Sequence, residues 1–166
     1  MRTGHTLAIL RHAKSAWPEG IADQLRPLAA RGQRDAPMAG RWLAGRTPVQ
    51  LLLCSPARRA RETAELVVAE LDPAPDITCD ERIYAGGVDG ACAVLRELPA
   101  SLGAVALIGH NPTLEELVDL LGGRSSRLKT SSIAVLESRS PWADIGSSGS
   151  AKHAWGRLTA EHTARG

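Results

Sequence analysis

The sequence lacks phenylalanine and has few cysteines, few lysines and no long apolar run. No apolar stretch approaches the roughly 18 residues that a membrane-spanning helix needs. The apolar stretch nearest the N-terminus, Thr6–Leu10, is also too short for the core of a signal peptide. We therefore expect a cytoplasmic protein with no membrane partner.

The cysteines Cys54, Cys79 and Cys92 are odd in number and form no C-x-x-C pair. This pattern argues against a disulfide scaffold and against a zinc site. Cys54 precedes several arginines, but the C-x5-R loop of cysteine phosphatases would need arginine at position 60, where the chain has Ala60. We expect buried thiols rather than a cysteine nucleophile.

Neither sign of charge is in excess, because 20 basic residues face 18 acidic ones and the formal net charge is +2. We therefore expect no nucleic-acid partner. Lysine is scarce: Lys14, Lys129 and Lys152 are the lysines, and arginine supplies all the other basic residues. Codon usage in a GC-rich genome would explain most of this bias, and an anion-binding site would explain part of it.

The length and a hydrophobic content of 43% suit one globular domain, expected to span residues 1–166. Short apolar runs alternate with segments of helical periodicity. The strands predicted from these runs are Thr6–Leu10, Leu51–Cys54, Ile77–Cys79, Ala104–Ile108, Ile133–Leu136 and Trp155–Leu158.

Helices are predicted between most of these strands. Ser55-Pro56 and Asn111-Pro112 each place a capping side chain before a proline, which is typical of a helix start. The predicted helices are Gln33–Arg46 (beginning near Pro37), Ser55-Pro56 to Asp72-Pro73, Asp89–Leu98, and Asn111-Pro112 to the stop signal Gly122-Gly123. Loops are predicted at Gly20–Arg31 and Gly146–Ser150, and His153 is expected at the edge of the last strand.

The alternation of strands and helices predicts an α/β sandwich around a mainly parallel sheet. The three strongest strands are followed by Arg11-His12, Ser55-Pro56 and Gly109-His110. Ligands of open α/β sheets bind outside the carboxyl ends of the strands, so these loops predict one shared site.

Such a site would contain two histidines, arginines from the segment "SPARRARET" and two helix N-termini. Arginine binds phosphate oxygens in a bidentate manner, and a helix N-terminus favours an anion. A neutral histidine nitrogen can attack phosphorus, and a second histidine can donate hydrogen bonds to the phosphoryl oxygens. This chemistry requires no metal and no cofactor.

Three segments resemble the histidine phosphatase superfamily, the phosphoglycerate mutase-like enzymes. "LAILRHAKSAW" is similar to the arginine-histidine signature, "CSPARRARETAEL" to the block S-x-x-x-R-A-x-x-T-A, and "ALIGHNPTLEEL" to the block with the second histidine. The resemblance covers residues 6–121 in the family's order. It implies a three-layer α/β/α sandwich around a mainly parallel sheet with an antiparallel edge.

Residue by residue, the resemblance makes His12 the phosphate-accepting nucleophile and Arg11 its phosphate-binding neighbour. The register of the second block selects Arg59, and His110 corresponds to the second histidine. The chain departs from the family's R-H-G-E start, with Ala13 in place of glycine and Lys14 in place of glutamate. Alanine fits there unless the backbone needs a positive φ.

Three further residues, Lys14, Ser15 and Asn111, lie next to these motif positions and are candidates for substrate binding, although Lys14 would equally suit a solvent-facing position. Glu81, in "DERIYAG", resembles the acidic residue of mutase-type members and is the candidate general acid, with a surface salt bridge as its alternative role. The phosphohistidine phosphatase branch manages without such an acid, because an imidazole leaving group has a pKa near 6.5.

The interval between Tyr84 and Leu107 is too short for the helical cap that closes over small substrates in mutase-like members. We therefore expect no cap subdomain. Together with the "RHAKS" start, this favours the small bacterial phosphohistidine phosphatase branch and a phosphorylated protein as partner. A phosphatase for small phosphoesters, such as sugar or nucleotide phosphates, and a non-catalytic phosphoprotein binder remain the alternatives.

Overall fold

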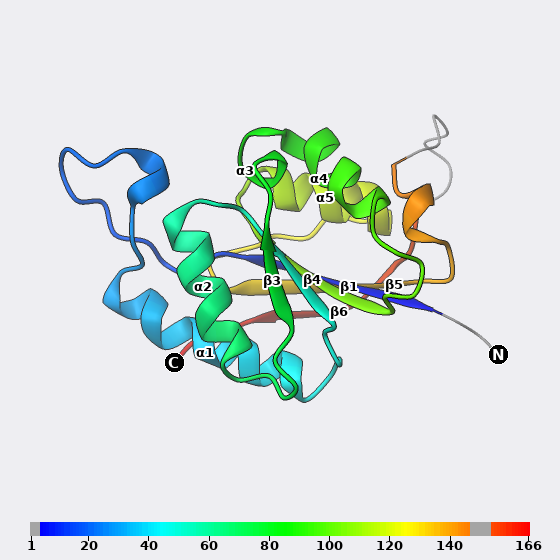
Figure 1. The fold of residues 1–166 in the computed structure, drawn as a ribbon, viewed down its shortest axis with the longest axis horizontal. Helices are drawn as coiled ribbons and strands as arrows, with labels where there is room; N and C mark the ends of the chain where they lie inside the picture. The colour runs from blue at the N-terminus through cyan, green and yellow to red at the C-terminus, as the bar shows by residue number, and fades with distance from the viewer. Residues whose placement is uncertain (1–3, 147–153) are drawn as a thin grey trace.

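A computed structural model describes residues 4–146 and 154–166 of the chain. Six strands form one sheet in the order β3-β2-β4-β1-β5-β6 (Figure 1). The strands are β1 (His5–Arg11), β2 (Leu51–Cys54), β3 (Asp76–Cys79), β4 (Ala104–Gly109), β5 (Ser132–Ser138) and β6 (Arg157–Thr163). The helices are α1 (Ala30–Ala44), α2 (Arg58–Val68), α3 (Arg82–Ala85), α4 (Gly87–Arg96) and α5 (Thr113–Gly122), with 3₁₀ helices at Asp23–Leu25 and Trp142–Asp144.

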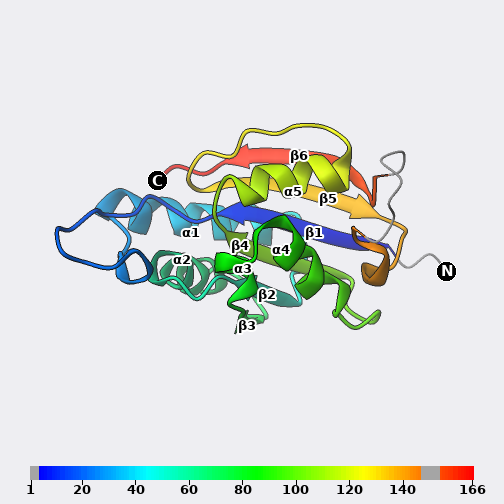
Figure 2. The ribbon, with the colours of Figure 1, turned by 90° about the horizontal axis from the view of Figure 1, so that it is seen from above.

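The sheet is mainly parallel. Strands β3, β2, β4 and β1 run in one direction, whereas β5 pairs antiparallel with β1, and β6 pairs antiparallel with β5. Helices α1 and α2 cover one face, and α4 and α5 cover the other (Figure 2). The predicted fold class, a three-layer α/β/α sandwich with an antiparallel edge, is confirmed. The described interval between Tyr84 and β4 holds the end of α3, helix α4 and a loop, with no cap subdomain.

Both faces of the central strands are buried, which explains their continuous apolar runs. In β1, Leu7 and Ile9 belong to the core under α4 and α5, whereas Ala8 and Leu10 belong to the core under α1 and α2. All of β4 is buried. Parallel strands that are covered on both sides need apolar residues at every position, and the sequence signal at β1, β2 and β4 is strong for this reason.

Helix α1 begins at Ala30, earlier than the predicted start near Pro37, and Pro37 lies inside it. The start is fixed by tertiary contacts with the loop that follows β1. The N–H of Ala29 donates to the carbonyl oxygen of Lys14 at 2.9 Å. Gly32 lies so close to the same carbonyl that an added Cβ would come within 2.1 Å of its oxygen. A local sequence signal does not report such a contact.

The two helix starts predicted from a capping side chain before a proline were wrong by one to three residues. Helix α2 begins at Arg58 and α5 at Thr113, with Ala57 and Pro112 at their N-cap positions. Ser55 and Asn111 contact neighbouring segments instead: Ser55 Oγ lies 2.8 Å from His110 Nε2, and Asn111 Nδ2 donates to the carbonyl oxygen of Leu128 at 2.7 Å.

The last strand was predicted at Trp155–Leu158 but spans Arg157–Thr163. Trp155 instead stacks on Trp142 with ring centroids 5.3 Å apart, so its apolar signal comes from packing beyond the sheet. The short helix α3 was not predicted, and the helix expected at Asp89–Leu98 is α4. The loop predicted at Gly20–Arg31 contains a 3₁₀ helix and the first residues of α1.

Residues 147–150 of the predicted loop Gly146–Ser150, and His153, lie outside the described residues. Among the described residues, no helix has the length and apolar character needed to cross a membrane.

Candidate active site

The carboxyl ends of the three neighbouring strands β2, β4 and β1 bring the predicted motifs together. His12 follows β1, Ser55 follows β2 and His110 follows β4. Backbone hydrogen bonds hold the first two loops against β4, since His12 N–H donates to Gly109 O at 3.1 Å and Ser55 N–H donates to Ile108 O at 3.0 Å. The rings of His12 and His110 are consequently 5.1 Å apart between centroids.

His12 is buried, with 7% of its surface exposed. Its Nδ1 lies 2.7 Å from the carbonyl oxygen of Ala13, which can only accept, so Nδ1 carries the proton and Nε2 keeps a lone pair. Burial lowers the pKa of His12 to about 3, with further lowering by the nearby His110, Arg59 and Arg11 and an opposing effect of the hydrogen bond to Ala13. At neutral pH the ring is therefore uncharged, with its lone pair on Nε2.

Ala13 fits the position where the family has glycine. Ser131 is the non-glycine residue with a positive φ among the described residues, so Ala13 adopts an ordinary backbone conformation. Its N–H donates to Thr63 Oγ1 at 3.0 Å, and that hydroxyl donates to the carbonyl oxygen of Arg59 at 2.7 Å. One side chain of α2 therefore links the backbone after His12 to the backbone of the arginine.

His110 contacts Arg59, Ser55 and Tyr84. Arg59 Nη2 donates to Nδ1 of His110 at 3.3 Å, which leaves Nε2 as the protonated nitrogen, 2.8 Å from Ser55 Oγ. The Tyr84 ring meets the His110 ring edge-on at 5.5 Å. Burial, followed by the charge of Arg59, lowers the pKa of His110 to about 4. In the neutral ring, Nε2–H donates to Ser55 Oγ.

Of the three clustered arginines, Arg59 reaches the site. Its neighbours face elsewhere, as Arg58 pairs with Glu62 at 3.3 Å and Arg61 donates to the carbonyl oxygen of Pro56 at 2.9 Å. Arg11 donates from Nη1 to the carbonyl oxygen of Leu128 at 3.1 Å. The Nε atoms of Arg11 and Arg59 are buried without a hydrogen-bond partner, so both guanidinium groups keep unused donors.

These side chains line a cavity of about 240 Å³. The predicted site residues that the structure brings together around it are Arg11, His12, Lys14, Ser15, Arg59, His110 and Asn111. Lys14 lines the cavity and is also exposed on the protein surface.

Glu81 is the predicted site residue that the structure leaves outside. It is exposed, stands immediately before α3 and does not line the cavity. The surface ion pairs of this segment belong to Arg82, which binds Asp80 at 2.8 Å and Glu97 at 2.6 Å. Among the described residues, the cavity lining contains no aspartate or glutamate.

Sequence reasoning missed Asp23, which lies in the loop between β1 and α1. Arg59 donates from Nη1 to its carbonyl oxygen at 2.7 Å and from Nη2 to Oδ2 at 3.0 Å. Tyr84 donates to the same Oδ2 at 2.6 Å, and Arg26 pairs with Oδ1 at 3.0 Å. These donors, Tyr84 first, hold the pKa of Asp23 well below its ordinary value. No local pattern marks Asp23, because its partners are distant in the sequence.

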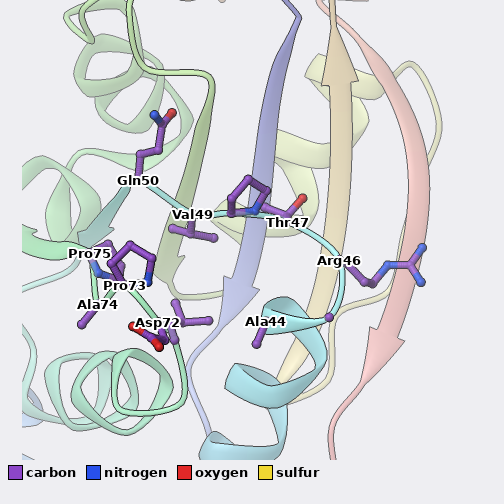
Figure 3. A pocket seen from close by; sticks show the side chains of 12 residues that line it. Ala44, Arg46, Thr47, Val49, Gln50, Asp72, Pro73, Ala74 and Pro75 are labelled. Atoms are coloured by element: carbon purple, nitrogen blue, oxygen red, sulfur yellow. The ribbon is translucent and has the colours of Figure 1, made fainter.

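A larger cavity of about 610 Å³ lies at the opposite end of the sheet, between the segments that lead into β2 and β3 (Figure 3). Residues 44–50 and 71–75 line it. Its polar side chains do not converge on one point. Gln50 Oε1 accepts from the N–H groups of Gly103 and Ala104. Arg46 extends away from Asp72 (Figure 3). The lining includes no histidine or cysteine.

Comparisons with known proteins relate the chain to one family. The model of the histidine phosphatase superfamily (branch 1) matches residues 7–84. The uncharacterized protein Rv1276c of Mycobacterium tuberculosis is 36% identical over 148 residues, which cover 82% of this chain and 91% of that protein.

Two solved structures carry the name phosphohistidine phosphatase SixA. The one from Nakamurella multipartitia has a TM-score of 0.81 and 28% identity, over 97% of this chain and 96% of that one. The one from Agrobacterium tumefaciens has a TM-score of 0.74 and 29% identity, over 81% and 92%. These similarities, together with the histidines and arginines near the carboxyl ends of β1, β2 and β4, show that the chain belongs to the histidine phosphatase superfamily. Its structural neighbours include the small bacterial phosphohistidine phosphatase branch.

Proposed function

We propose that the protein hydrolyses phosphohistidine in a protein substrate through a phosphorylated His12, without a metal or other cofactor. The observation that carries this proposal is the composition of the cavity. It presents an uncharged imidazole nitrogen, two arginines with unused donors and a second histidine, and no carboxyl group among the described residues.

In the first step, Nε2 of His12 attacks phosphorus, and the bond from phosphorus to the substrate nitrogen breaks. The substrate imidazole departs carrying the proton that it took up from solvent. Arg11 and Arg59 bind the equatorial oxygens. His110 donates to one of them from Nε2 once that N–H exchanges its hydrogen bond with Ser55 Oγ for one with the phosphoryl oxygen. Two fixed positive charges and a neutral donor suit the negative charge that spreads over these oxygens during transfer.

In the second step, water attacks the phosphorus of phosphorylated His12, and the bond to Nε2 breaks. Inorganic phosphate leaves with the oxygen of that water, and His12 returns to its neutral form. The hydrogen bond from Nδ1 to Ala13 O holds the ring in place throughout both steps.

The position of Glu81 favours phosphohistidine over a phosphoester. A substrate alcohol would leave as an alkoxide and would need a proton from a positioned acid. The candidate acid is exposed outside the cavity. An imidazole with a pKa near 6.5 takes its proton from solvent, so its departure needs no positioned acid in the site.

The size of the site and the structural neighbours both support this substrate class. A cavity of about 240 Å³ is smaller than the roughly 300–1,000 Å³ typical of small-molecule sites, and it suits one phosphorylated side chain. The two neighbours that are 28% and 29% identical are named as phosphohistidine phosphatases, which supports the same substrate class here.

A substrate panel tests this proposal. Phosphate release would be measured for a phosphohistidine protein, potassium phosphoramidate and a set of sugar and nucleotide phosphates, with wild type, His12→Ala and Glu81→Gln. We expect turnover of the phosphoramidate substrates by wild type and by Glu81→Gln, and none by His12→Ala. Labelled phosphate should be trapped on His12 after rapid quenching.

Faster hydrolysis of esters than of phosphohistidine, lost in Glu81→Gln, would instead identify a phosphoester phosphatase. Binding of phosphohistidine protein with no labelled enzyme and no phosphate release would identify a non-catalytic binder. Activity of His12→Ala equal to that of wild type would refute the mechanism.

A further inference from the structure

The loop between β1 and α1 exposes large apolar side chains, one of which lines the cavity. Among the described residues, the exposed large hydrophobic side chains are Trp17 (73% exposed), Ile21 (42%), Leu25 (58%) and Leu120 (50%). The first three lie in this one loop, which extends from the carboxyl end of β1 beyond the body of the sandwich (Figures 1 and 2). We call Trp17, Ile21 and Leu25 the loop patch.

The loop is held in one conformation although its apolar side chains face solvent. The two ends of the loop are joined by a hydrogen bond from Ala16 N–H to Pro27 O at 2.9 Å and by an isolated β-bridge between Ser15 and Leu28. Arg26 is buried between them, where it donates from Nε to Ala16 O at 3.1 Å and from Nη2 to Ser15 Oγ. An ordered apolar surface loses less conformational entropy when a partner covers it.

Trp17 joins the loop patch to the site. It lines the cavity that contains His12, and the Arg26 guanidinium lies 3.2 Å from the centroid of its ring. The arginine fixes the orientation of the indole, so the remaining surface of the ring is presented next to the mouth of the cavity. The same loop carries Asp23, which accepts two hydrogen bonds from Arg59, so these bonds join the loop to the arginine of the site.

We propose that the loop patch binds apolar side chains that flank the phosphorylated histidine of the substrate protein. This inference rests on the proposed function, because it assumes a phosphohistidine in the cavity. The cavity is large enough for the phosphorylated side chain but not for its neighbours, which must lie on the rim. Trp17 lies on that rim, because it lines the cavity and is largely exposed, and Ile21 and Leu25 are exposed on the same loop. Tryptophan is one of the residue types that most often dominate protein–protein binding energy.

Two synthetic peptides of equal length and net charge, each phosphorylated at one histidine, test this proposal. One has leucine and isoleucine at the positions on both sides of the histidine, and the other has serine there. Potassium phosphoramidate serves as a third substrate that reaches the cavity and cannot reach the patch. The measured quantity is kcat/KM for phosphate release from each substrate.

We expect wild type to prefer the apolar peptide by about tenfold or more, since each factor of ten corresponds to about 1.4 kcal/mol of binding. Ile21→Ser with Leu25→Ser should abolish this preference, mainly through a higher KM, while phosphoramidate turnover stays within about twofold of wild type. Leu120→Ser is the matched control, because it removes an equally exposed apolar side chain from α5. It should keep the preference.

Equal kcat/KM for the two peptides in wild type would overturn the proposal. So would a preference that survives in the double variant, or a parallel loss of phosphoramidate turnover, which would assign the patch a role in folding. If the double variant dissociates a dimer in sedimentation velocity while the preference survives, the patch is a self-association surface instead. Failure of wild type to release phosphate from all three substrates would refute the proposed function itself, which is a separate outcome.

Discussion

The two ends of the sheet differ in what their side chains do. At the carboxyl end, histidines and arginines converge on a cavity of about 240 Å³. At the amino end, a cavity of about 610 Å³ is lined mostly by small and apolar residues, with Arg46 and Asp72 as its charged groups, and its glutamine bonds the start of β4. The histidines and the arginines selected by the sequence motifs therefore lie at the smaller cavity. Strand direction accounts for the contrast, because parallel strands deliver the loops after β1, β2 and β4 to the same end.

The largest expected effect is the loss of the nucleophile at the carboxyl end. His12→Ala should lower kcat for phosphohistidine hydrolysis by more than roughly 10⁴-fold, because His12 Nε2 carries a free lone pair whereas the lone pair of His110 Nδ1 accepts from Arg59. His162→Ala, on β6, is the matched control and should retain turnover. Phosphate release over time measures both, and substantial activity in His12→Ala would place the chemistry elsewhere.

A smaller loss of activity is expected when position 59 keeps its positive charge but loses the planar guanidinium group. Arg59→Lys should reduce kcat/KM on the order of 10²-fold, because an ammonium group cannot bind two phosphoryl oxygens as a planar fork does. Arg58→Lys, one position away and paired with Glu62, should change it little. Equal effects of the two substitutions would show that Arg59 acts through general positive charge alone.

The buried histidines make stability depend on pH in a defined direction. The pKa of His12 is lowered to about 3 and that of His110 to about 4, whereas an unfolded histidine titrates near pH 6.5. Between these values the unfolded state binds more protons, so the free energy of unfolding falls as pH falls. We expect a loss of about 2–4 kcal/mol between pH 7 and pH 5, measured by urea denaturation.

Replacing His12 provides the control for this pH dependence. His12→Asn should reduce the loss by about half, since one of the two depressed groups is then gone. A free energy of unfolding that stays constant from pH 7 to pH 5 in wild type would contradict the burial of both rings as uncharged groups.

Asp23 should have a moderate effect, because it orients Arg59 without lining the cavity. Asp23→Ala removes the carboxylate that binds Arg59 Nη2 and should lower kcat/KM by about tenfold. Asp23→Asn keeps one acceptor oxygen and should lose less. Tighter inhibition by inorganic phosphate with an unchanged kcat would show that Asp23 competes with substrate for Arg59 rather than orienting it.

The smallest effect is expected at the amino end of the sheet. Arg46→Ala and Asp72→Asn alter the charged groups of the larger cavity and should leave kcat/KM for phosphohistidine within about twofold of wild type. A drop comparable with that of Arg59→Lys would show that the two ends are coupled, and the contrast between them would fail.

Much of the fold could be predicted because β1, β2 and β4 are buried on both faces, and such strands are continuous apolar runs. Arg11, His12, Arg59 and His110 could be found because each lies in a short motif beside one of those runs or in the following helix. Asp23 could not, since its bonds to Arg59 and Tyr84 join distant parts of the chain. The helix starts were misplaced for a similar reason: Ser55 and Asn111 serve tertiary contacts that a local capping rule does not include.

The hydrogen bond from His12 Nδ1 to the carbonyl oxygen of Ala13 also determines the regiochemistry of any intermediate. With Nδ1 occupied by its proton, a phosphoryl group can be accepted on Nε2 alone. The phosphorylated enzyme would then be one positional isomer rather than a mixture, and the two nitrogens give distinct phosphorus resonances. A backbone carbonyl, supplied by the residue next to the nucleophile, selects that isomer.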